Sequence, residues 1–282
     1  MDACLLIDKP QNMTSFDVCH QLRKITGEKR IGHTGTLDPN ATGLLIVLLG
    51  KYTKYLPYCD HDRKEYIASF KLGQKTDTLD IWGNVVATKA VISVTAKQWE
   101  AVFKSFLGKQ KQIPPMVSAI KKDGKRLYEL AFAGQEVERE ARDIEIYELE
   151  LLSASETEVS FRAVVSSGTY IRSLCEDMAA KTGNYAMMSA LRRTKIQDIK
   201  IDQACSLTNC LDHLQDIKIK DILNTNYEKI EVTPQQISDI KNGKRMKLAA
   251  NTDIVILCFA DQILAAYERV ENDIYKSKRG LF

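Results

Sequence analysis

The sequence has no apolar run that approaches the ~20 residues needed to cross a membrane. Its first ten residues, MDACLLIDKP, carry no basic segment before a short apolar stretch, so we expect no signal peptide. The seven cysteines are odd in number and include no CxxC pair. This usage favours reduced thiols in the cytoplasm over a disulfide framework, so a secreted or membrane-spanning protein is not expected.

A strong excess of one charge is also missing. The formal net charge is only +3, which by itself does not indicate a nucleic-acid-binding protein. The local balance differs, because Lys104–Arg126 holds seven cations and one acid. Two smaller basic groups lie at residues 24–33 and at Arg192–Lys195. Such groups are either solvated faces or phosphate contacts, and charge alone does not choose between them.

One stretch, Ile31–Gly50, combines a loop rich in Gly, Thr, Asp and Pro with an apolar strand. Leu44–Leu49 is almost wholly aliphatic, which is typical of a strand buried on both faces. Asp38 therefore lies in a shaped loop that is anchored to a core element. The loop is either a tight turn with a solvated Asp or a mount for a functional carboxylate.

The length of 282 residues suggests one large or two modest domains, and hydrophobic patterning predicts both strands and helices. The predicted strands are residues 4–7, 44–49, 66–72, 142–152, 159–166 and 186–193. The predicted helices are residues 14–25, 51–60, 94–107, 126–133 and 169–181, the last capped by Thr169. Beyond residue 224 we expect a short helix at 232–242 and small strands at 253–266 and 267–278.

Several separated strings of the chain resemble TruB-type pseudouridine synthases, which modify uridine-55 in the T arm of tRNA. The central string carries His33, Gly35, Leu37, Asp38, Ala41, Gly43 and Leu44 at the spacing of the catalytic motif of that family. The others are KP…TS from residue 9, KEYIASFKLG from residue 64, QIPPM…FAG at 112–134 and GTYIR at 168–172. Five strings in the family's order, spread over residues 9–200, make the resemblance specific.

The resemblance implies a role for six residues. Asp38 is the catalytic carboxylate, Arg172 pairs with it, and Tyr66 stacks on the target base. Tyr170 and Leu191 contact the target uridine, and His33 fills or holds the gap that a flipped base leaves. The expected catalytic residues are therefore Asp38, Tyr66 and Arg172, and the expected substrate-binding residues are His33, Tyr66, Tyr170 and Leu191. By residue type alone, the aromatic and Leu residues also suit a core, and the Arg suits a surface.

Three positions depart from the family pattern. Asn12 stands where Gly is usual, Val117 where an aromatic is common, and Phe132 where Arg is common. Asn tolerates the left-handed backbone region, so the turn at residue 12 is expected to persist. The change at Phe132 removes one expected RNA contact and leaves the catalytic assignment untouched.

The resemblance implies an α+β fold, in which a mixed, mainly antiparallel central sheet is flanked by helices. Residues 1–224 would form the pseudouridine synthase catalytic domain, and residues 225–282 a short, β-rich, PUA-like RNA-binding domain. The expected partner is the T stem-loop of tRNA, in the cytoplasm. We expect no cofactor, no DNA, no membrane and no obligate protein partner.

Two candidate metal sites are weak. Asp77 and Asp80 lie three residues apart in a polar loop, without His, Cys or further acids beside them. We expect this loop to cap an element or to contact RNA. Cys205, Cys210 and His213 offer three ligands at an unusual spacing for zinc, so we expect structural thiols and no metal.

Two other functions stay open from the sequence. The chain is either a tRNA-binding or chaperone module without catalysis, or a guide-RNA-dependent relative of the same family. The motifs around Asp38, Tyr66 and Arg172 disfavour the first, because binding alone needs no acid in a site that attracts phosphate. The short C-terminal region disfavours the second. Whether Asp38 adds to C1′ or removes the 2′ proton also stays open.

Overall fold

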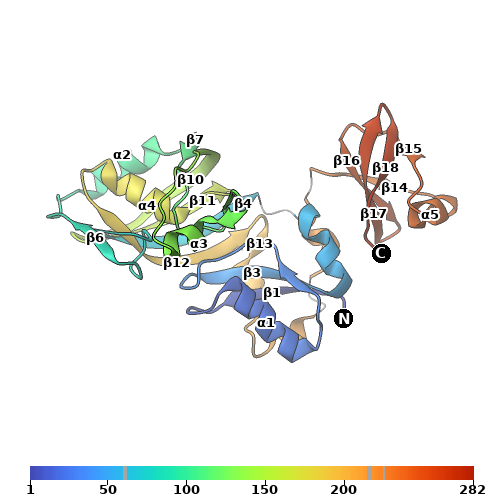
Figure 1. Ribbon diagram of the computed structural model, residues 1–282, viewed down its shortest axis with the longest axis horizontal. Coiled ribbons are helices and arrows are strands. Elements are labelled where there is room, and N and C mark those ends of the chain that lie inside the picture. Colours follow the sequence, from blue (N-terminus) through green and yellow to red (C-terminus); the bar gives the residue numbers. More distant parts are fainter. Residues whose placement is uncertain (60–61, 215–216, 225) are drawn as a thin grey trace.

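The computed structural model describes residues 1–59, 62–214, 217–224 and 226–282. A nine-stranded sheet forms the body of residues 1–224 (Figure 1). Its main path runs β1 (Ala3–Lys9), β3 (Thr42–Leu49), β12 (Ala186–Ile196), β4 (Arg63–Leu72), β11 (Glu158–Ser166), β10 (Arg142–Ala154) and β7 (Gly108–Gln112), with β2 (Ile31–His33) beside β3 and β13 (Ile199–Lys200) beside β12. Neighbouring strands are antiparallel except β12 and β3, so the predicted mixed, mainly antiparallel sheet is confirmed.

The central strand β3 is as buried as its sequence predicts, because Leu44–Leu49 are all fully enclosed. Its parallel contact with β12 joins only Thr42 to Arg192 and Gly43 to Arg193. Gly43 has φ +108°, and an added Cβ would clash with the Arg193 backbone. Glycine is therefore required where the two strands meet.

Helices cover the sheet in two places (Figure 1). α1 (Ser15–Thr26) packs on β1 and β3 through Val18, Cys19 and Leu22. α2 (Ala96–Ser105) and α4 (Ile171–Ala180) pack against the other end of the sheet. The remaining helices are α3 (Leu127–Phe132), α5 (Pro234–Lys241) and the 3-10 helices η1 (Gly50–Tyr58), η2 (Ile201–Gln203), η3 (Cys210–His213) and η4 (Ile219–Asp221).

Local signals set most helix ends. Thr14 caps α1 through a reciprocal pair of hydrogen bonds with Asp17, and Gly27 ends it at φ +69°. The predicted cap of α4 is wrong, because Tyr170, not Thr169, precedes the helix and its side chain makes no capping hydrogen bond. The predicted helix at 51–60 is the 3-10 helix η1, and its last predicted residue lies outside the described ranges.

Two small hairpins project from the body. β5 (Gln74–Thr76) pairs with β6 (Val85–Thr88), and β8 (Lys121–Lys122) pairs with β9 (Lys125–Arg126). Within the described ranges, no helix is both long and apolar enough to cross a membrane.

The C-terminal residues form a second, five-stranded sheet with α5 at its side (Figure 1). Its order is β14 (Glu228–Glu231), β16 (Ile254–Phe259), β17 (Gln262–Glu271), β18 (Ile274–Gly280) and β15 (Met246–Lys247). The predicted strand boundary at 266–267 is wrong, because β17 runs through it. The turns fall instead at Ala260 and Asn272, both at positive φ.

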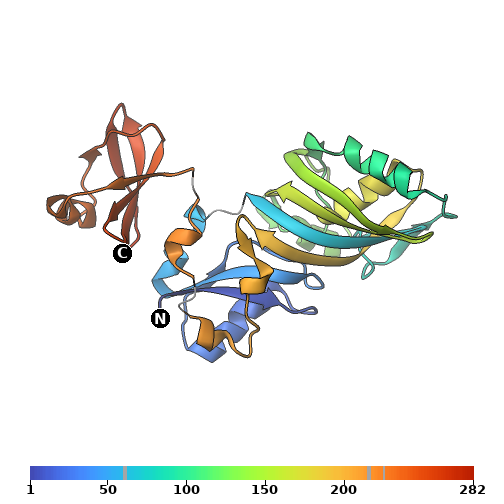
Figure 2. The same ribbon diagram turned by 180° about the vertical axis from the view of Figure 1, so that it is seen from behind.

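The second sheet lies beside η1 and the β1–β3 end of the first sheet (Figure 2). Tyr55 and Tyr58 of η1 share a core cluster with Ile263, Ala266 and Leu281. The Tyr55 hydroxyl donates to the Leu281 carbonyl at 3.0 Å. These contacts join the two sheets through buried side chains.

Candidate active site

The loop that carries Asp38 is fixed at both sides. Leu37 is buried, its amide donates to Ser15 Oγ at 2.9 Å, and that hydroxyl lies 3.3 Å from the Leu37 carbonyl. Ala41 is also buried, and its amide donates to the Asp38 carbonyl at 3.1 Å. The first turn of α1 and the start of β3 therefore hold Asp38 in one position.

Lys9, at the end of β1, also holds this loop, a role that sequence patterning does not assign to it. Its ammonium donates to the carbonyls of Pro10, Met13 and Pro39 at 2.8, 2.6 and 3.0 Å. Burial lowers the pKa of Lys9 to about 8, although the nearby Asp38 charge acts in the opposite direction. The residue after Asp38 is thus tied to the end of β1.

Arg172 forms a two-point ion pair with Asp38, as the resemblance implies. Its Nε lies 2.9 Å from Oδ2 and its Nη2 lies 3.1 Å from Oδ1. The Arg172 side chain is 5% exposed, whereas that of Asp38 is 35% exposed. The guanidinium is therefore internal, and the carboxylate presents one side to an incoming ligand.

The orientation of Arg172 depends on backbone groups from two other segments. Its Nη1 donates to the Thr78 carbonyl at 2.8 Å, and its Nη2 donates to the Val117 carbonyl at 2.9 Å. Asp80 Oδ2 lies 3.9 Å from Nε. The polar loop at residues 76–84 thus supports the ion pair. Within that loop, Asp80 accepts hydrogen bonds from Thr78 Oγ1 and from the Trp82 amide.

Tyr66 and Leu191 form an apolar wall on neighbouring strands. Both are buried, at 8% and 9% exposure, and both belong to the core cluster that includes Leu37 and Ala41. Ala68, two residues after Tyr66, lies opposite Leu191 in the β4–β12 register. The Asp38 loop therefore packs onto the same cluster as this wall.

Tyr170 is half-buried and immediately precedes α4, two residues before Arg172 in the sequence. Gln112 fixes its backbone, because Gln112 Oε1 accepts from the Tyr170 amide at 2.8 Å and Nε2 donates to its carbonyl at 3.0 Å. Sequence patterning does not assign this role to Gln112, since a single buried amide has no periodic signature.

His33 lies in β2, not in the loop that follows it. It is half-buried, and its Nδ1 has no hydrogen-bond partner among the described residues. Burial, with a smaller contribution from the Arg193 charge, lowers the pKa of His33 below its usual value. The imidazole is therefore neutral at pH 7.

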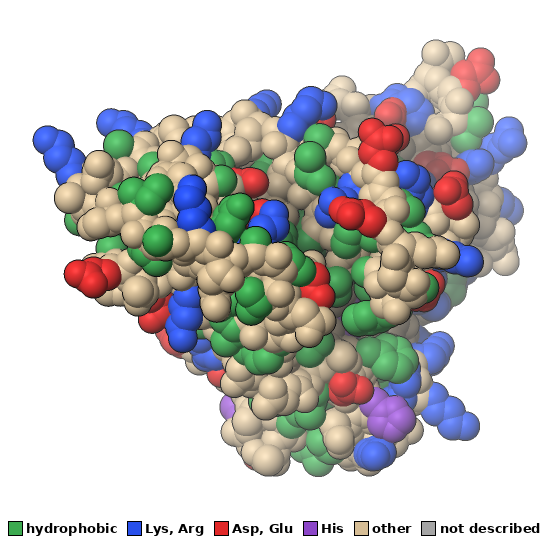
Figure 3. All heavy atoms as spheres, turned by 60° about the vertical axis from the view of Figure 1, so that its left-hand side comes forward, with side chains coloured by type: hydrophobic (Ala, Val, Ile, Leu, Met, Phe, Trp, Pro, Cys, Tyr) green, Lys and Arg blue, Asp and Glu red, His purple; other side chains and the backbone are tan. Residues whose placement is uncertain are grey.

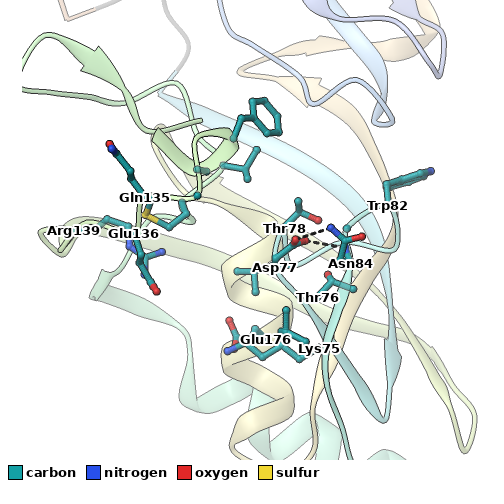
Figure 4. A pocket seen from close by; sticks show the side chains of 18 residues that line it. Lys75, Thr76, Asp77, Thr78, Trp82, Asn84, Gln135, Glu136, Arg139 and Glu176 are labelled. Carbon is teal, nitrogen blue, oxygen red and sulfur yellow. Dashed lines mark hydrogen bonds and ion pairs between the residues drawn. The ribbon is translucent and has the colours of Figure 1, made fainter. Parts of the chain in front are cut away.

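A cavity of about 810 Å³ lies between the 75–84 loop and the 116–139 segment. Figure 4 shows Asp77 and Asn84 hydrogen-bonded on one side, with Gln135, Glu136 and Arg139 on the other. Thr78 and Val117, whose carbonyls hold Arg172, line it as well. The cavity therefore adjoins the Asp38 pair without including Asp38.

The basic groups of the sequence differ in their exposure to solvent. All seven cations of Lys104–Arg126 are exposed, as a phosphate contact requires. Lys and Arg side chains project around a recess on the face shown in Figure 3. Arg192–Lys195 does not form an exposed cationic surface of the same kind, because Arg193 is fully buried and Arg192 pairs with Asp8 at 2.7 Å.

A family model described as "TruB family pseudouridylate synthase (N terminal domain)" matches residues 23–171. The match spans more than half of the chain and contains Asp38 and Tyr66. This chain belongs to the TruB family of pseudouridylate synthases.

Curated relatives of this TruB-family protein extend the match. It is 42% identical over 255 residues to the tRNA pseudouridine synthase B of Syntrophomonas wolfei, covering 87% of this chain and 85% of the relative. It is 39% identical over 290 residues to the tRNA pseudouridine synthase B of Oenococcus oeni, covering 98% and 97%.

Solved structures confirm the pseudouridine synthase fold of the TruB-family chain. A Cbf5–Nop10–Gar1 complex matches with a TM-score of 0.73 and 23% identity, covering 99% of this chain and 85% of that chain. An H/ACA ribonucleoprotein bound to a substrate RNA that contains 2′-deoxyuridine matches with a TM-score of 0.71 and 20% identity, covering 99% and 85%. The likeness includes the second sheet, which is consistent with a PUA-like domain.

Proposed function

We propose that this protein isomerises uridine-55 in the T arm of tRNA to pseudouridine, with Asp38 as the catalytic carboxylate. The observation that carries the proposal is the two-point Asp38–Arg172 pair beside Tyr66 and Leu191, in a member of the TruB family. The relatives named tRNA pseudouridine synthase B support tRNA as the substrate.

The reaction breaks the N1–C1′ bond of uridine, turns the uracil and joins C5 to C1′. The proton leaves C5 and N1 gains one, so the product has the composition of the substrate and needs no redox partner. A carboxylate next to the ribose acts either on C1′ or on the 2′ proton. Asp38 suits both roles, because Arg172 orients both of its oxygens and part of its side chain stays accessible.

The freed uracil must stay in place and water must stay away from C1′. The apolar wall of Tyr66 and Leu191 suits both needs, with Tyr170 as a further contact to the base. Stacking on Tyr66 offsets part of the few kcal/mol needed to flip the base out of the RNA loop. The neutral His33 is the residue we assign to the gap that the base leaves.

We further propose that the protein acts in the cytoplasm without a guide RNA or an obligate protein partner. The 42% identity to a relative named tRNA pseudouridine synthase B exceeds the 20–23% identity to the Cbf5–Nop10–Gar1 complex and the H/ACA ribonucleoprotein. Residues 1–224 would be the catalytic domain. Residues 225–282 would be a PUA-like domain that binds RNA with its exposed cations.

The central test is Asp38→Asn, which keeps the size of the side chain and removes its charge. We expect no release of tritium from tRNA labelled at uridine C5, because C5 must lose its hydrogen to join C1′. Affinity for the same tRNA should stay within a few-fold of wild type. Asp143→Asn, at a highly exposed ion pair with Lys111, is the matched control and should release tritium at the wild-type rate.

Turnover by Asp38→Asn near the wild-type rate would show that Asp38 is not the catalytic group. Binding without tritium release by the wild type, in an assay with no other protein, would support the non-catalytic alternative. Release only after addition of a guide RNA would support the guide-dependent alternative.

A further inference from the structure

Arg193 is fully buried and keeps part of its guanidinium unused. Its Nε donates to the Leu44 carbonyl at 2.7 Å, and its Nη2 donates to the Gly35 carbonyl at 3.1 Å. Its Nη1 has no hydrogen-bond partner among the described residues. A buried guanidinium nitrogen without an acceptor is costly, so its presence points to an acceptor that arrives from outside the chain.

Lys64 places a second cation at the same location. Its ammonium makes one long hydrogen bond, 3.4 Å to Ser167 Oγ. In the part of the chain that the structure describes, no carboxylate lies within ion-pair distance of Lys64 or Arg193. Burial and the Arg193 charge lower the pKa of Lys64 to about 8, although Asp62 acts in the opposite direction. At Lys64 the repulsion from Arg193 therefore outweighs the attraction of Asp62.

Both cations point toward the space over Gly35. A methyl group added at Gly35 would lie 3.6 Å from Lys64 Nζ and 3.7 Å from Arg193 Nη1. The two nitrogens thus lie on either side of one point that no atom of the described residues occupies. An oxygen at that point would come within hydrogen-bonding distance of either nitrogen after a slight shift. A glycine here also lets a ligand approach the backbone closely.

This point continues the proposed base-binding wall. Lys64 and Tyr66 are two residues apart on β4, and Leu191 and Arg193 are two apart on β12, so each pair faces the same side of the sheet. Arg193 lies directly opposite Tyr66 in the β4–β12 register. A group bound between the cations would therefore sit next to a nucleotide stacked on Tyr66.

We propose that Lys64 Nζ and Arg193 Nη1 together bind one phosphodiester of the substrate RNA over Gly35. The inference rests on the proposed function, because that function brings an RNA backbone to this side of the sheet. The flexible Lys64 side chain moves with the entering oxygen, and this exposes Nη1. The bound phosphate neutralises the repulsion between the cations and fixes the sugar that Asp38 attacks or deprotonates.

The first experiment measures how salt affects the affinity of a T stem-loop RNA for the wild type and for Lys64→Met. Loss of one phosphate contact should lower the slope of log affinity against log salt by about 0.7 to 0.9. Affinity at low salt should fall about tenfold. Lys64→Arg should restore both. Lys71→Met, at an exposed lysine near the other end of β4, is the matched control and should change neither.

The second experiment identifies the phosphate. Each linkage around the target uridine is replaced in turn by a neutral methylphosphonate. At one linkage the replacement should weaken binding by the wild type about tenfold and leave Lys64→Met unchanged. At every other linkage the two proteins should respond alike.

Gly35→Ala gives a test that leaves both cations in place. Its methyl group makes only ordinary contacts, so the fold should persist, but it fills the point that the oxygen needs. The variant should lose the response at the linkage found above. Circular dichroism and thermal unfolding confirm that the variant is folded.

Three outcomes would overturn the inference. In the first, the wild type binds the RNA, but methylphosphonate replacement at every linkage weakens binding by the wild type and by Lys64→Met equally. This outcome would leave the proposed function intact. The second is Lys64-dependent binding of inorganic phosphate with no linkage effect, which would mean a site for a free oxyanion. The third is no RNA binding by the wild type, which would remove the proposed function as well.

Discussion

The Asp38–Arg172 pair concentrates four long-range contacts on one guanidinium. Arg172 holds both oxygens of Asp38 and reaches the carbonyls of Thr78 and Val117. Only the planar, multiply donating guanidinium can make all of these contacts at once. The position of the carboxylate is therefore set by the shape of its partner as much as by its charge.

Arg172→Lys should lower the single-turnover rate about a hundredfold, because a lysine keeps the charge and loses the two-point geometry. Arg162→Lys is the control, since Arg162 bridges Glu65, Glu148 and Glu150 without contacting Asp38. Rapid-quench tritium release on folded protein measures both rates. An unchanged rate for Arg172→Lys would contradict the role of the pair in orienting Asp38.

Lys64 also gives the molecule a defined pH dependence. Its pKa is lowered from 10.5 to about 8, so folding penalises the charged form. That penalty is complete below pH 8 and is relieved as pH rises toward 10.5, because the unfolded chain then binds more protons. Relative to Lys64→Met, the wild type should therefore gain stability between pH 8 and 10.5.

The measurement is urea unfolding of both RNA-free proteins at several values of pH from 7 to 10.5. The difference in free energy of unfolding should change by at most about 1.4 kcal/mol per pH unit, the limit for one proton. Lys9 has a similar pKa shift but is present in both proteins, so the comparison isolates Lys64. A difference that does not vary with pH would mean that Lys64 titrates normally.

At the scale of elements, α1 and β3 hold the Asp38 loop between them. Ser15, the first residue of α1, contacts the backbone of Leu37 twice, next to Asp38. The capping residues Thr14 and Asp17 fix where that first turn begins. The capped first turn of α1 thereby helps to fix the position of the Asp38 carboxylate.

Thr14→Ala should lower the free energy of unfolding by about 1 kcal/mol through loss of the cap. It should also lower the rate per folded molecule, because the first turn of α1 positions the loop. Thr95→Ala removes the same kind of cap from α2, whose first turn makes no hydrogen bond to Leu37 or Asp38 within the described ranges, and is the matched control. If the two variants affected the rate equally, the cap of α1 would have no specific role in positioning the Asp38 loop.

Much at this scale was predictable from sequence. The aliphatic run Leu44–Leu49 specified a buried strand, and Thr14 and Gly27 specified the ends of α1, because each signal acts locally. The carbonyls of Thr78 and Val117 were not predictable as acceptors, because every residue type has a carbonyl. Arg193 looked like a surface cation, since only the meeting of β3 with β12 encloses it.

The same limit applies to the family motifs. They indicated that Asp38 and Arg172 meet, and the structure contains that pair. They did not indicate Lys9 as the anchor of Pro39 or Gln112 as the brace of Tyr170. Both are single polar residues buried by distant segments, so neither periodicity nor spacing identifies them. The catalytic and binding roles themselves stay predictions.

At the scale of the whole molecule, a small net charge conceals an uneven distribution. The exposed cations of Lys104–Arg126 end in the β8–β9 hairpin, which carries Lys121, Lys122, Lys125 and Arg126. Near the hairpin, Phe132 is 78% exposed, at a position where the family resemblance implies a cation. The surface therefore offers a local phosphate contact without a strong overall field.

Replacing Lys121 and Lys125 with Gln should reduce the salt slope of tRNA affinity by about 1 to 2, because up to two phosphate contacts are lost. Binding at low salt should weaken, whereas the rate at saturating tRNA should change little. Lys71→Gln with Lys181→Gln, two exposed lysines outside this segment, is the control. A salt slope equal to that of the wild type would exclude the hairpin from the tRNA contact.

The partners in the Asp38–Arg172 pair are 134 residues apart in the chain. During translation at 5 to 20 residues per second, the ribosome needs roughly 7 to 27 s to add Arg172 after Asp38. Until then the nascent chain carries the acid without its guanidinium. Competence for chemistry on RNA therefore arises late in synthesis, after the loop that bears the acid has left the ribosome.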